Sequence, residues 1–134
     1  QLGLKNITFH GLLPMEEVPN YIAKADICIG LLDKADKIDR VIPVKSFEVA
    51  AMKKPLITVE SPAVKELFKN EESVLFCKPA DPTSLAQAIL KLKNNKDLAN
   101  KIASNAYNIY QKQCTTKAIG QKLQNIIQTF LKKP

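Results

Sequence analysis

Two oppositely charged side chains, Lys45 and Glu48, lie three residues apart in a segment with the signals of a helix start. Pro43 is expected at the first helical position, which proline favours because the N–H group that it lacks would have no partner there. The positive end of the helix dipole repels a lysine in the first turn, so Lys45 makes most sense if an anion also binds this helix end. The first backbone amides of a helix have no internal acceptors, and those of Val44, Lys45 and Ser46 would face the same anion. The spacing therefore predicts an anion site, with Glu48 on the lysine's face about one turn further along.

A surface ion pair is the alternative explanation for Lys45 and Glu48, and such pairs are common and contribute only about 0.2–0.5 kcal/mol. The sequence that follows the pair favours a ligand site instead. Small residues at 49–52 suit close packing on a sheet, and a proline then leads into an apolar strand expected at 56–59. A helix that runs into such a strand is typical of open α/β sheets, which bind ligands at the ends of their strands.

These residues resemble a known motif. The pattern Pro-x-Lys-x-x-Glu-x-x-Ala, followed by a short turn, a proline and an apolar strand, is similar to the donor-nucleotide motif of retaining GT-B glycosyltransferases. The similarity is to the C-terminal, nucleotide-sugar-binding domain of the group 1 family. Phe-His-Gly at 9–11 and Ala-Asp at 25–26, before an apolar run, fit the same domain. The resemblance implies that Lys45 meets the donor diphosphate and that Glu48 holds ribose hydroxyls.

Arg40 departs from that family's pattern. Many members have a glutamate eight residues before the one that matches Glu48, and it contacts hydroxyls of the transferred sugar. Here that position holds Arg40, with Asp39 beside it. Three interpretations stay open. In the first, a shift of one residue lets Asp39 contact the sugar hydroxyls. In the second, Arg40 binds a carboxylate or acetamido group on the sugar. In the third, Arg40 is a solvated loop residue.

His10 is the only histidine, and it follows a strand expected at 7–9, where the chain would reach the ligand-binding edge of a sheet. It could contact the donor near its base together with Leu12, although a lone histidine more often has a structural role. No Ser/His/Asp set, Cys/His set or metal cluster can be assembled, so no catalytic residue is assigned and no metal site is expected. The three cysteines have neither disulfide nor metal-ligand spacing, which favours a reducing, cytoplasmic setting.

The elements that would position these residues alternate between strands and helices. Strands are expected at 7–9, 26–32, 56–59 and 73–77, and helices at 15–25, 43–52, 63–69, from 81, at 97–111 and from Thr115 or Thr116. This alternation predicts an α/β fold: a Rossmann-like parallel sheet with flanking helices, equivalent to the later part of a GT-B C-terminal domain. Residues 1–134 would then be a partial nucleotide-sugar-binding domain, with strand–helix units at 1–80 and a helical segment at 81–134. The run at 26–32 should be covered on both faces, and the charged loop at 33–40 should hang over the ligand site.

The net charge of +7 is concentrated near the C-terminus. Residues 1–60 hold eight basic and eight acidic side chains, whereas residues 91–134 hold nine lysines and one acid, Asp97. This end is either a solvated lysine-rich face or a surface attracted to an anionic membrane, where each nearby lysine contributes about 1 kcal/mol. Nucleic acid is not an expected partner, because no aromatic residues alternate with the lysines. No apolar run reaches the roughly 20 residues of a membrane span.

We therefore expect the chain to be a piece of a longer retaining glycosyltransferase, of the hexosyltransferase type, that uses a UDP-sugar or GDP-sugar and no further cofactor. Its acceptor, a glycan or a lipid-linked molecule, would be bound by an N-terminal domain. The piece alone should not catalyse sugar transfer. The expected role is polysaccharide biosynthesis in the cytoplasm, with peripheral contact at the inner membrane face as a hypothesis. Two alternatives remain: a nucleotide-sugar epimerase-like GT-B domain, and a basic α/β interaction module with no nucleotide site.

Overall fold

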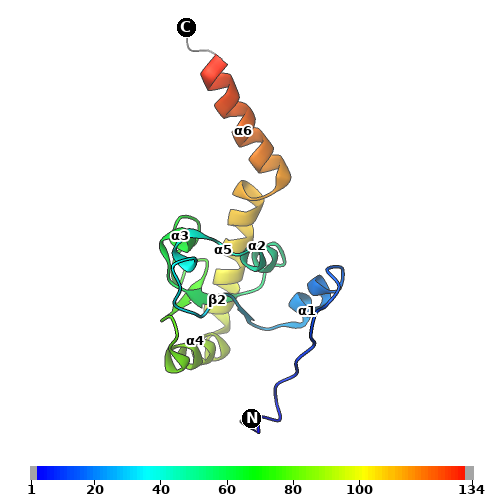
Figure 1. Cartoon of the computed structure of the whole chain (residues 1–134), viewed down its shortest axis with the longest axis vertical. Coiled ribbons are helices and arrows are strands. Elements are labelled where there is room, and N and C mark those ends of the chain that lie inside the picture. Colours follow the sequence, from blue (N-terminus) through cyan, green and yellow to red (C-terminus); the bar gives the residue numbers. More distant parts are fainter. Residues whose placement is uncertain (1–2, 132–134) are drawn as a thin grey trace.

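Three short parallel strands form the centre of the fold in the computed structural model, which describes residues 3–131 (Figure 1). The strands β1 (Cys28–Ile29), β2 (Leu56–Val59) and β3 (Leu75–Cys77) lie in that order across the sheet. β2 is the central strand and pairs in parallel with both neighbours, so that Ile57 lies opposite a residue of each. The predicted parallel α/β sheet is confirmed.

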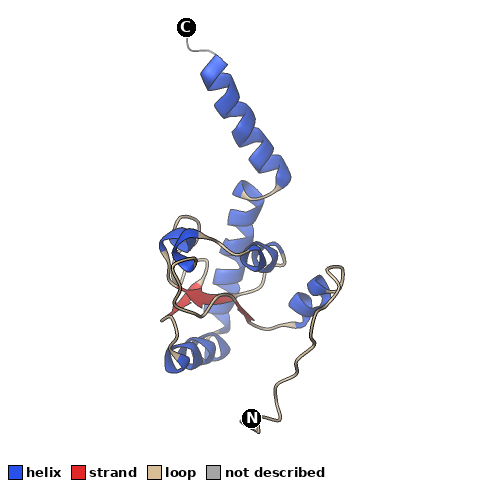
Figure 2. Ribbon diagram, in the orientation of Figure 1, coloured by secondary structure: helices blue, strands red, loops and turns tan. Residues whose placement is uncertain are grey.

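Helices surround this sheet and make up most of the chain that the structure describes (Figure 2). They are α1 (Val18–Lys24), the 3₁₀ helix η1 (Ile38–Arg40), α2 (Val44–Ala51), α3 (Pro62–Lys65), α4 (Pro82–Asn94), α5 (Lys96–Gln113) and α6 (Thr116–Leu131). All strands precede α4, and α6 projects away from the body (Figure 1). Within residues 3–131, no helix is both long and apolar enough to cross a bilayer.

Each face of the sheet carries its own hydrophobic core, because successive side chains of a strand point to opposite faces. On one face, Ile57 of β2 packs in a cluster with residues of α4. On the other face, Leu56 of β2 packs in a second cluster with Val49 of α2. α5 contributes to both clusters, through Ile102 to the first and Ala106 to the second. The sheet is therefore covered by helices on both sides.

Short polar side chains start the later helices where the sequence predicts. The Asp81 carboxylate accepts a hydrogen bond from the Ser84 amide at the start of α4, at 2.9 Å. Thr115, rather than Thr116, caps α6, because its hydroxyl oxygen accepts from the Ala118 amide at 3.2 Å. Each bond satisfies a first-turn amide that has no acceptor inside its helix.

A tight helix end joins α2 to β2. Lys53 adopts a left-handed backbone conformation, with φ of 54°. The amides of Lys53 and Lys54 then donate to the carbonyl oxygens of Ala50 and Val49, at 3.1 Å each. This pair of bonds closes the last turn of α2 and directs the chain through Pro55 into β2.

The prediction of a strand at 7–9 is wrong. No strand is found among residues 3–17, and Phe9 is 91% exposed. A strand exists only where a neighbour completes its hydrogen bonds, and in the described chain nothing pairs with the outer edge of β1. The first helix is also shorter than expected, because it begins at Val18 and leaves Glu16 and Glu17 outside it.

β1 is much shorter than the run expected at 26–32, and it is not covered on both faces. It contains two residues, and Ile29 is 41% exposed. The pairing with β2 nevertheless continues past it, since the Gly30 amide donates to Ile57 and the Leu31 carbonyl accepts from Val59. β1 is an edge strand here, which explains the uncovered side chain.

Gly30 marks the closest approach between the first two strands. Its amide donates to the Ile57 carbonyl at 2.7 Å, and a Cβ atom placed on Gly30 would lie 2.6 Å from Thr58 Oγ1. This hydroxyl is fixed, because it donates to the Leu31 carbonyl and accepts from the Leu31 amide, each at 3.2 Å. A side chain larger than hydrogen at this position must displace Thr58.

Gly30→Ala is therefore expected to lower the free energy of unfolding by about 1–3 kcal/mol, the usual cost of overpacking a core position. Gly120→Ala in α6 is the matched control, because nothing lies within 4 Å of a Cβ atom at that position. Urea denaturation followed by circular dichroism compares the two. Equal midpoints would show that Thr58 does not constrain the chain at Gly30.

Candidate functional site

α2 presents its first turn at the edge of the sheet where the strands end. It connects β1 to β2 and packs across one face, so it runs antiparallel to both strands. In open α/β sheets, ligands bind outside the carboxyl ends of the strands. The start of α2 therefore lies where such a sheet binds its ligands.

Pro43 is the N-cap of α2 and not its first helical residue, which corrects the prediction from sequence. The chain reaches it from an extended segment, and Pro43 is itself extended, with φ of −67° and ψ of 147°. The Ser46 amide donates to the Pro43 carbonyl at 2.9 Å, so one of the three amides expected at the anion site is already engaged. Among residues 3–131, no acceptor is found for the Val44 and Lys45 amides. Two backbone donors remain for an anion.

Lys45 and Glu48 lie on α2 without pairing to each other. Lys45 is exposed and Glu48 is partly exposed. None of the three ion pairs found among residues 3–131 includes either side chain. The surface ion pair considered as the alternative is therefore not formed within the described chain, and both charged groups are accessible to a ligand.

Ser46 is buried, with 1% of its surface exposed, and its hydroxyl oxygen has no hydrogen-bond partner within residues 3–131. Val49 and Ala50, three and four residues further on, are buried as well, so these residues form the core-facing side of α2. Lys45 lies on the exposed side. Ser46 therefore faces the core at the start of the helix, although its residue type does not distinguish it from a surface serine.

A hollow of about 250 Å³ lies at the carboxyl edge of the sheet, among the loops that follow the three strands. The loop after β1 supplies six of its lining residues, and Val59, Glu60 and Pro79 supply the rest. Four of the lining side chains are carboxylates, which accept hydrogen bonds from hydroxyl groups: Asp33, Asp36, Asp39 and Glu60. The loop at 33–40 lines this hollow with Ile38 buried beneath it.

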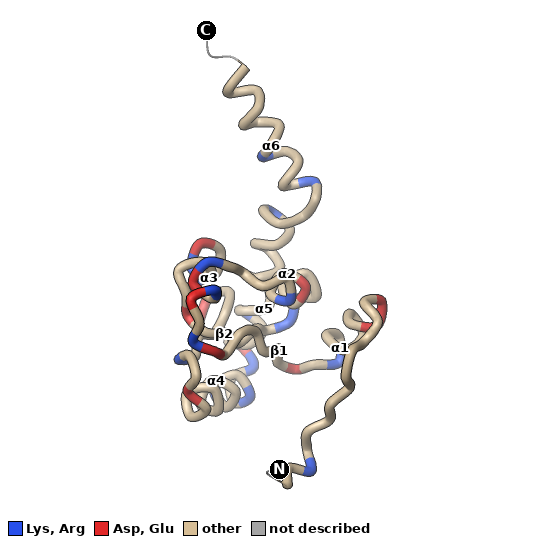
Figure 3. Tube along the Cα trace, in the orientation of Figure 1, with Lys and Arg blue, Asp and Glu red and all other residues tan. Residues whose placement is uncertain are grey.

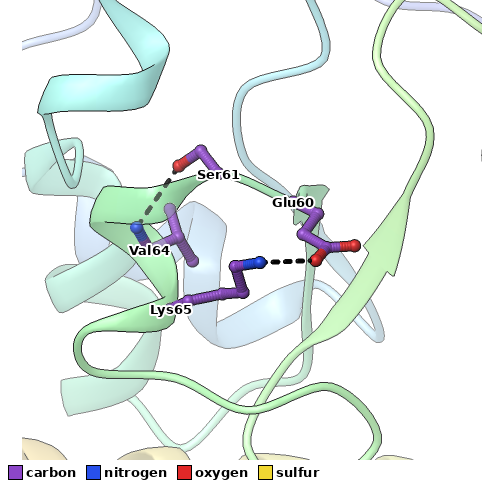
Figure 4. Close-up of polar contacts among 4 residues, drawn as sticks. All are labelled: Glu60, Ser61, Val64 and Lys65. Atoms are coloured by element: carbon purple, nitrogen blue, oxygen red, sulfur yellow. Dashed lines mark hydrogen bonds and ion pairs between the residues drawn. The ribbon is translucent and has the colours of Figure 1, made fainter.

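Glu60 and Pro79 were not singled out from the sequence. Glu60 directly follows the fully buried strand β2, and that position is the signal that could have identified it. Local contacts hold this loop: Glu60 pairs with Lys65 at 2.9 Å, and the Ser61 hydroxyl accepts from the Val64 amide at 3.2 Å (Figure 4).

Asp39 and Arg40 differ in their relation to the hollow. Both belong to η1 and both are exposed, but Asp39 lines the hollow and Arg40 is not among its lining residues. Of the sequence-based interpretations of this pair, the geometry favours the one in which Asp39 faces a ligand.

His10 and Leu12 are not brought to this site. They lie on the N-terminal segment, which stands with α1 to one side of the body (Figure 1), and neither lines the hollow. The Tyr21 hydroxyl lies 3.4 Å from His10 Nδ1, and the two rings meet edge to face at 4.8 Å. Leu12 is fully exposed. The strand end that suggested their position is absent, and His10 has a structural contact instead.

Neither metal nor thiol chemistry is indicated in the described chain. Among residues 3–131, no group of three His, Cys, Asp or Glu side chains is placed to hold a metal ion. Burial raises the pKa of the Cys28, Cys77 and Cys114 thiols above the ordinary value. These thiols are therefore protonated at neutral pH and are poor nucleophiles.

A family model described as "Glycosyl transferase-like" matches residues 2–125. The chain belongs to this family. YtcC of Bacillus subtilis (strain 168), which is named as a glycosyltransferase, is 26% identical to the chain over 127 residues. The match covers 94% of this chain but 30% of YtcC, so the chain spans less than a third of that relative's length.

Solved structures share the fold. Sucrose-phosphate synthase from Thermosynechococcus elongatus has a TM-score of 0.75 and 20% identity, over 92% of this chain and 30% of its own. HepE of Anabaena, in complex with UDP, has a TM-score of 0.70 and 17% identity, over 84% of this chain and 30% of its own. The C-terminal domain of LpcC, a group 1 glycosyltransferase from Francisella tularensis, has a TM-score of 0.66 and 20% identity, over 82% of this chain and 53% of its own. The fold of the glycosyltransferase-like chain is thus that of GT-B C-terminal domains, as predicted.

Ser46→Ala is expected to raise the free energy of unfolding by about 1 kcal/mol, because it removes a buried hydroxyl without a partner. Ser61→Ala is the matched control. Ser61 is 2% exposed, but its hydroxyl caps α3, so the same substitution should lower the free energy of unfolding by about 1 kcal/mol. Urea denaturation measures both. Destabilisation by Ser46→Ala would contradict the absence of a partner.

Proposed function

We propose that this chain is the donor-binding part of a glycosyltransferase that moves a sugar from a UDP-sugar or GDP-sugar to an acceptor, with retention at the anomeric carbon. One observation carries the proposal. At the ligand-binding edge of the sheet, the first turn of α2 offers two backbone amides and the Lys45 ammonium, none of them paired within residues 3–131. A cation and free amides at one helix end form a binding site for a diphosphate.

Lys45 would act on the leaving group. Breaking the bond between the sugar and the diphosphate increases the negative charge on the nucleoside diphosphate. The Lys45 ammonium and the amides of Val44 and Lys45 would stabilise that charge as it develops. Glu48 would accept hydrogen bonds from the ribose hydroxyls and so fix the position of the donor. Val44 takes part through its backbone alone, and the Ser46 amide is engaged with Pro43.

The sugar would occupy the hollow at the carboxyl edge of the sheet. Its carboxylates suit hydroxyl groups and would repel a phosphate, which separates the sugar from the diphosphate. Asp39 would contact the sugar in place of the glutamate expected at Arg40. Arg40 would bind an acidic or acetamido substituent of the sugar only if η1 moved so that Arg40 faced the hollow.

Similar proteins support a nucleotide-sugar donor. HepE was solved with UDP, with UDP-glucose, and with UDP and glucose. We propose that this chain, which has the same fold, binds a donor of that class, and that its longer parent transfers a hexose from it without a further cofactor. The acceptor would be a glycan or a lipid-linked molecule, held by a domain that precedes this chain in a longer parent protein. The parent would function in polysaccharide biosynthesis in the cytoplasm, with peripheral contact at the inner membrane face, and this chain alone should not turn over.

The test is ligand-observed NMR with UDP, GDP and ADP, first on this chain and then on the full-length parent. One nucleotide should bind, and Lys45→Ala should weaken it by about tenfold or more, because a hydrogen bond to a charged group is lost. Glu48→Ala should weaken binding of the nucleotide but not of inorganic diphosphate, which has no ribose. Lys53→Ala is the control, since Lys53 is an exposed lysine at the opposite end of the same helix.

Three results would contradict the proposal. Nucleotide affinity unchanged by both Lys45→Ala and Glu48→Ala would place the site elsewhere. If none of the three nucleotides binds detectably to the full-length parent, a basic interaction module would be favoured. Turnover of a nucleotide-sugar by the parent without an acceptor, with inversion at a sugar carbon, would favour the epimerase-like alternative.

A further inference from the structure

Ala80 has a strained backbone next to Pro79, which lines the hollow. The φ angle of Ala80 is 52°, in the left-handed region that residues with a side chain seldom adopt. The side chain of Ala80 is exposed, so packing of its methyl group does not impose this conformation. Strained residues persist where the surrounding structure requires one particular conformation of the backbone. The reason for the strain at Ala80 therefore lies in its backbone contacts.

The amide of Ala80 joins two walls of the hollow. It donates to the Leu32 carbonyl at 2.7 Å. Leu32 immediately precedes the loop at 33–40, which lines one side of the hollow, and Pro79 immediately precedes Ala80 and lines another. β2 lies between β1 and β3 in the sheet, so this bond connects the loops on either side of the central strand. The bond thus fixes one wall of the hollow relative to the other.

The turn that contains Ala80 is anchored to the start of α4. The Lys78 amide donates to the Ser84 hydroxyl oxygen at 2.9 Å, and the Ser84 amide donates to the Asp81 carboxylate at 2.9 Å. These bonds hold the chain on both sides of Ala80. The left-handed φ of Ala80 then sets the direction in which its amide points, which is toward Leu32.

The loop at 33–40 depends on its two ends for its position. In the described chain, the hydrogen bonds of residues 33–37 are all made to partners inside the same loop. At one end, Leu32 is held by the Ala80 amide, and at the other end Ile38 is buried in the core. Loss of the bond at Leu32 would therefore release one end of the loop.

The position of this loop decides which charges face the hollow. Asp33, Asp36 and Asp39 recur at every third residue and line the hollow, and a basic residue follows each of them. Figure 3 shows acidic and basic segments close together beside α3, against which η1 packs. Of the three basic residues, Lys37 and Arg40 do not line the hollow. A small rotation of the loop would therefore replace carboxylates by cations in the hollow.

We infer that the left-handed turn at Ala80 positions the subsite for the donor's sugar. Its amide holds the loop at Leu32, so that the aspartates of the loop face the sugar hydroxyls. The inference rests on the proposed function and adds a residue to it. Ala80 acts as a positioning residue, because it does not line the hollow itself. The diphosphate would bind at α2, so loss of the turn should weaken binding of the sugar and spare binding of the diphosphate.

Substitutions at position 80 separate the conformation of the turn from the size of the side chain. Glycine and asparagine tolerate a positive φ, whereas valine, which is β-branched, does not. The full-length parent and its Ala80→Gly, Ala80→Asn and Ala80→Val variants are titrated calorimetrically with UDP and with UDP-glucose, or with GDP and GDP-mannose if guanine is the base that binds. Ala80→Val should weaken UDP-glucose binding about tenfold and UDP binding less than about twofold, because hydrogen bonds from the sugar to charged groups are lost. Ala80→Gly and Ala80→Asn should match the wild type.

Ser84→Ala is a second variant, which keeps the test decisive if the Ala80→Val protein does not fold. It removes the acceptor of the Lys78 amide and so loosens the turn from the side of α4. UDP-glucose binding should weaken about threefold relative to UDP binding, the effect of one neutral hydrogen bond. Urea midpoints, measured for every variant, establish that each protein is folded during the titration.

Four other results would overturn the inference. Equal weakening of UDP and UDP-glucose by Ala80→Val would show that the turn supports the fold in general. Equal losses for Ala80→Asn and Ala80→Val would exclude the backbone conformation as the cause. An affinity ratio that neither Ala80→Val nor Ser84→Ala changes would separate the turn from the sugar. If the wild-type parent binds neither nucleotide nor nucleotide-sugar, the proposed function fails, and the inference fails with it.

Discussion

Burial of β2 between two parallel neighbours is the constraint on which the rest of the structure depends. Its four residues are nearly inaccessible, and it hydrogen-bonds to β1 on one side and β3 on the other. α2 must end immediately before it, and the left-handed turn at Lys53 provides that end. The hollow begins at its carboxyl end, at Val59 and Glu60. The direction of one strand thus fixes both the start of α2 and the floor of the candidate site.

The side chains of α2 form a core-facing set and an exposed set. Ser46, Val49 and Ala50 face the core and hold the helix on the sheet, while Lys45 is exposed and Glu48 partly so. A rigid support of this kind places a cation and two backbone amides at a fixed position, which the proposed electrostatic stabilisation of a leaving group would require. The loop after β1 is held from below by Ile38, so the carboxylates of the hollow also rest on the core.

Local signals in the sequence were sufficient for the later helices and for the motif. Asp81 and Thr115 act as caps because capping depends on a few neighbouring residues, and the motif at 43–51 consists of one helix and its N-cap. Strand 7–9 could not be predicted in this way, because a strand depends on a partner that local sequence does not specify. The same reason explains why Ile29, in an apolar run, is exposed at an edge.

The site itself was only partly predictable. The position of Lys45 and Glu48 on one helix was predictable from their spacing, whereas the engagement of the Ser46 amide with Pro43 was not. The hollow combines loops that lie more than forty residues apart, from Asp33 to Pro79, so only the folded chain shows that Asp39 lines it and Arg40 does not. His10 was assigned to the same edge from a strand that does not form, and its contact with Tyr21 became visible only in the structure.

The central claim is that a diphosphate binds the free amides at the start of α2. Backbone amide chemical shifts of the ¹⁵N-labelled chain during a UDP titration test it most directly. The account predicts saturable shifts that are largest for Val44 and Lys45, smaller for Ser46, and strongly reduced in the Lys45→Ala protein at the same UDP concentration. Saturable shifts centred away from the start of α2, with Val44 and Lys45 unchanged, would contradict it.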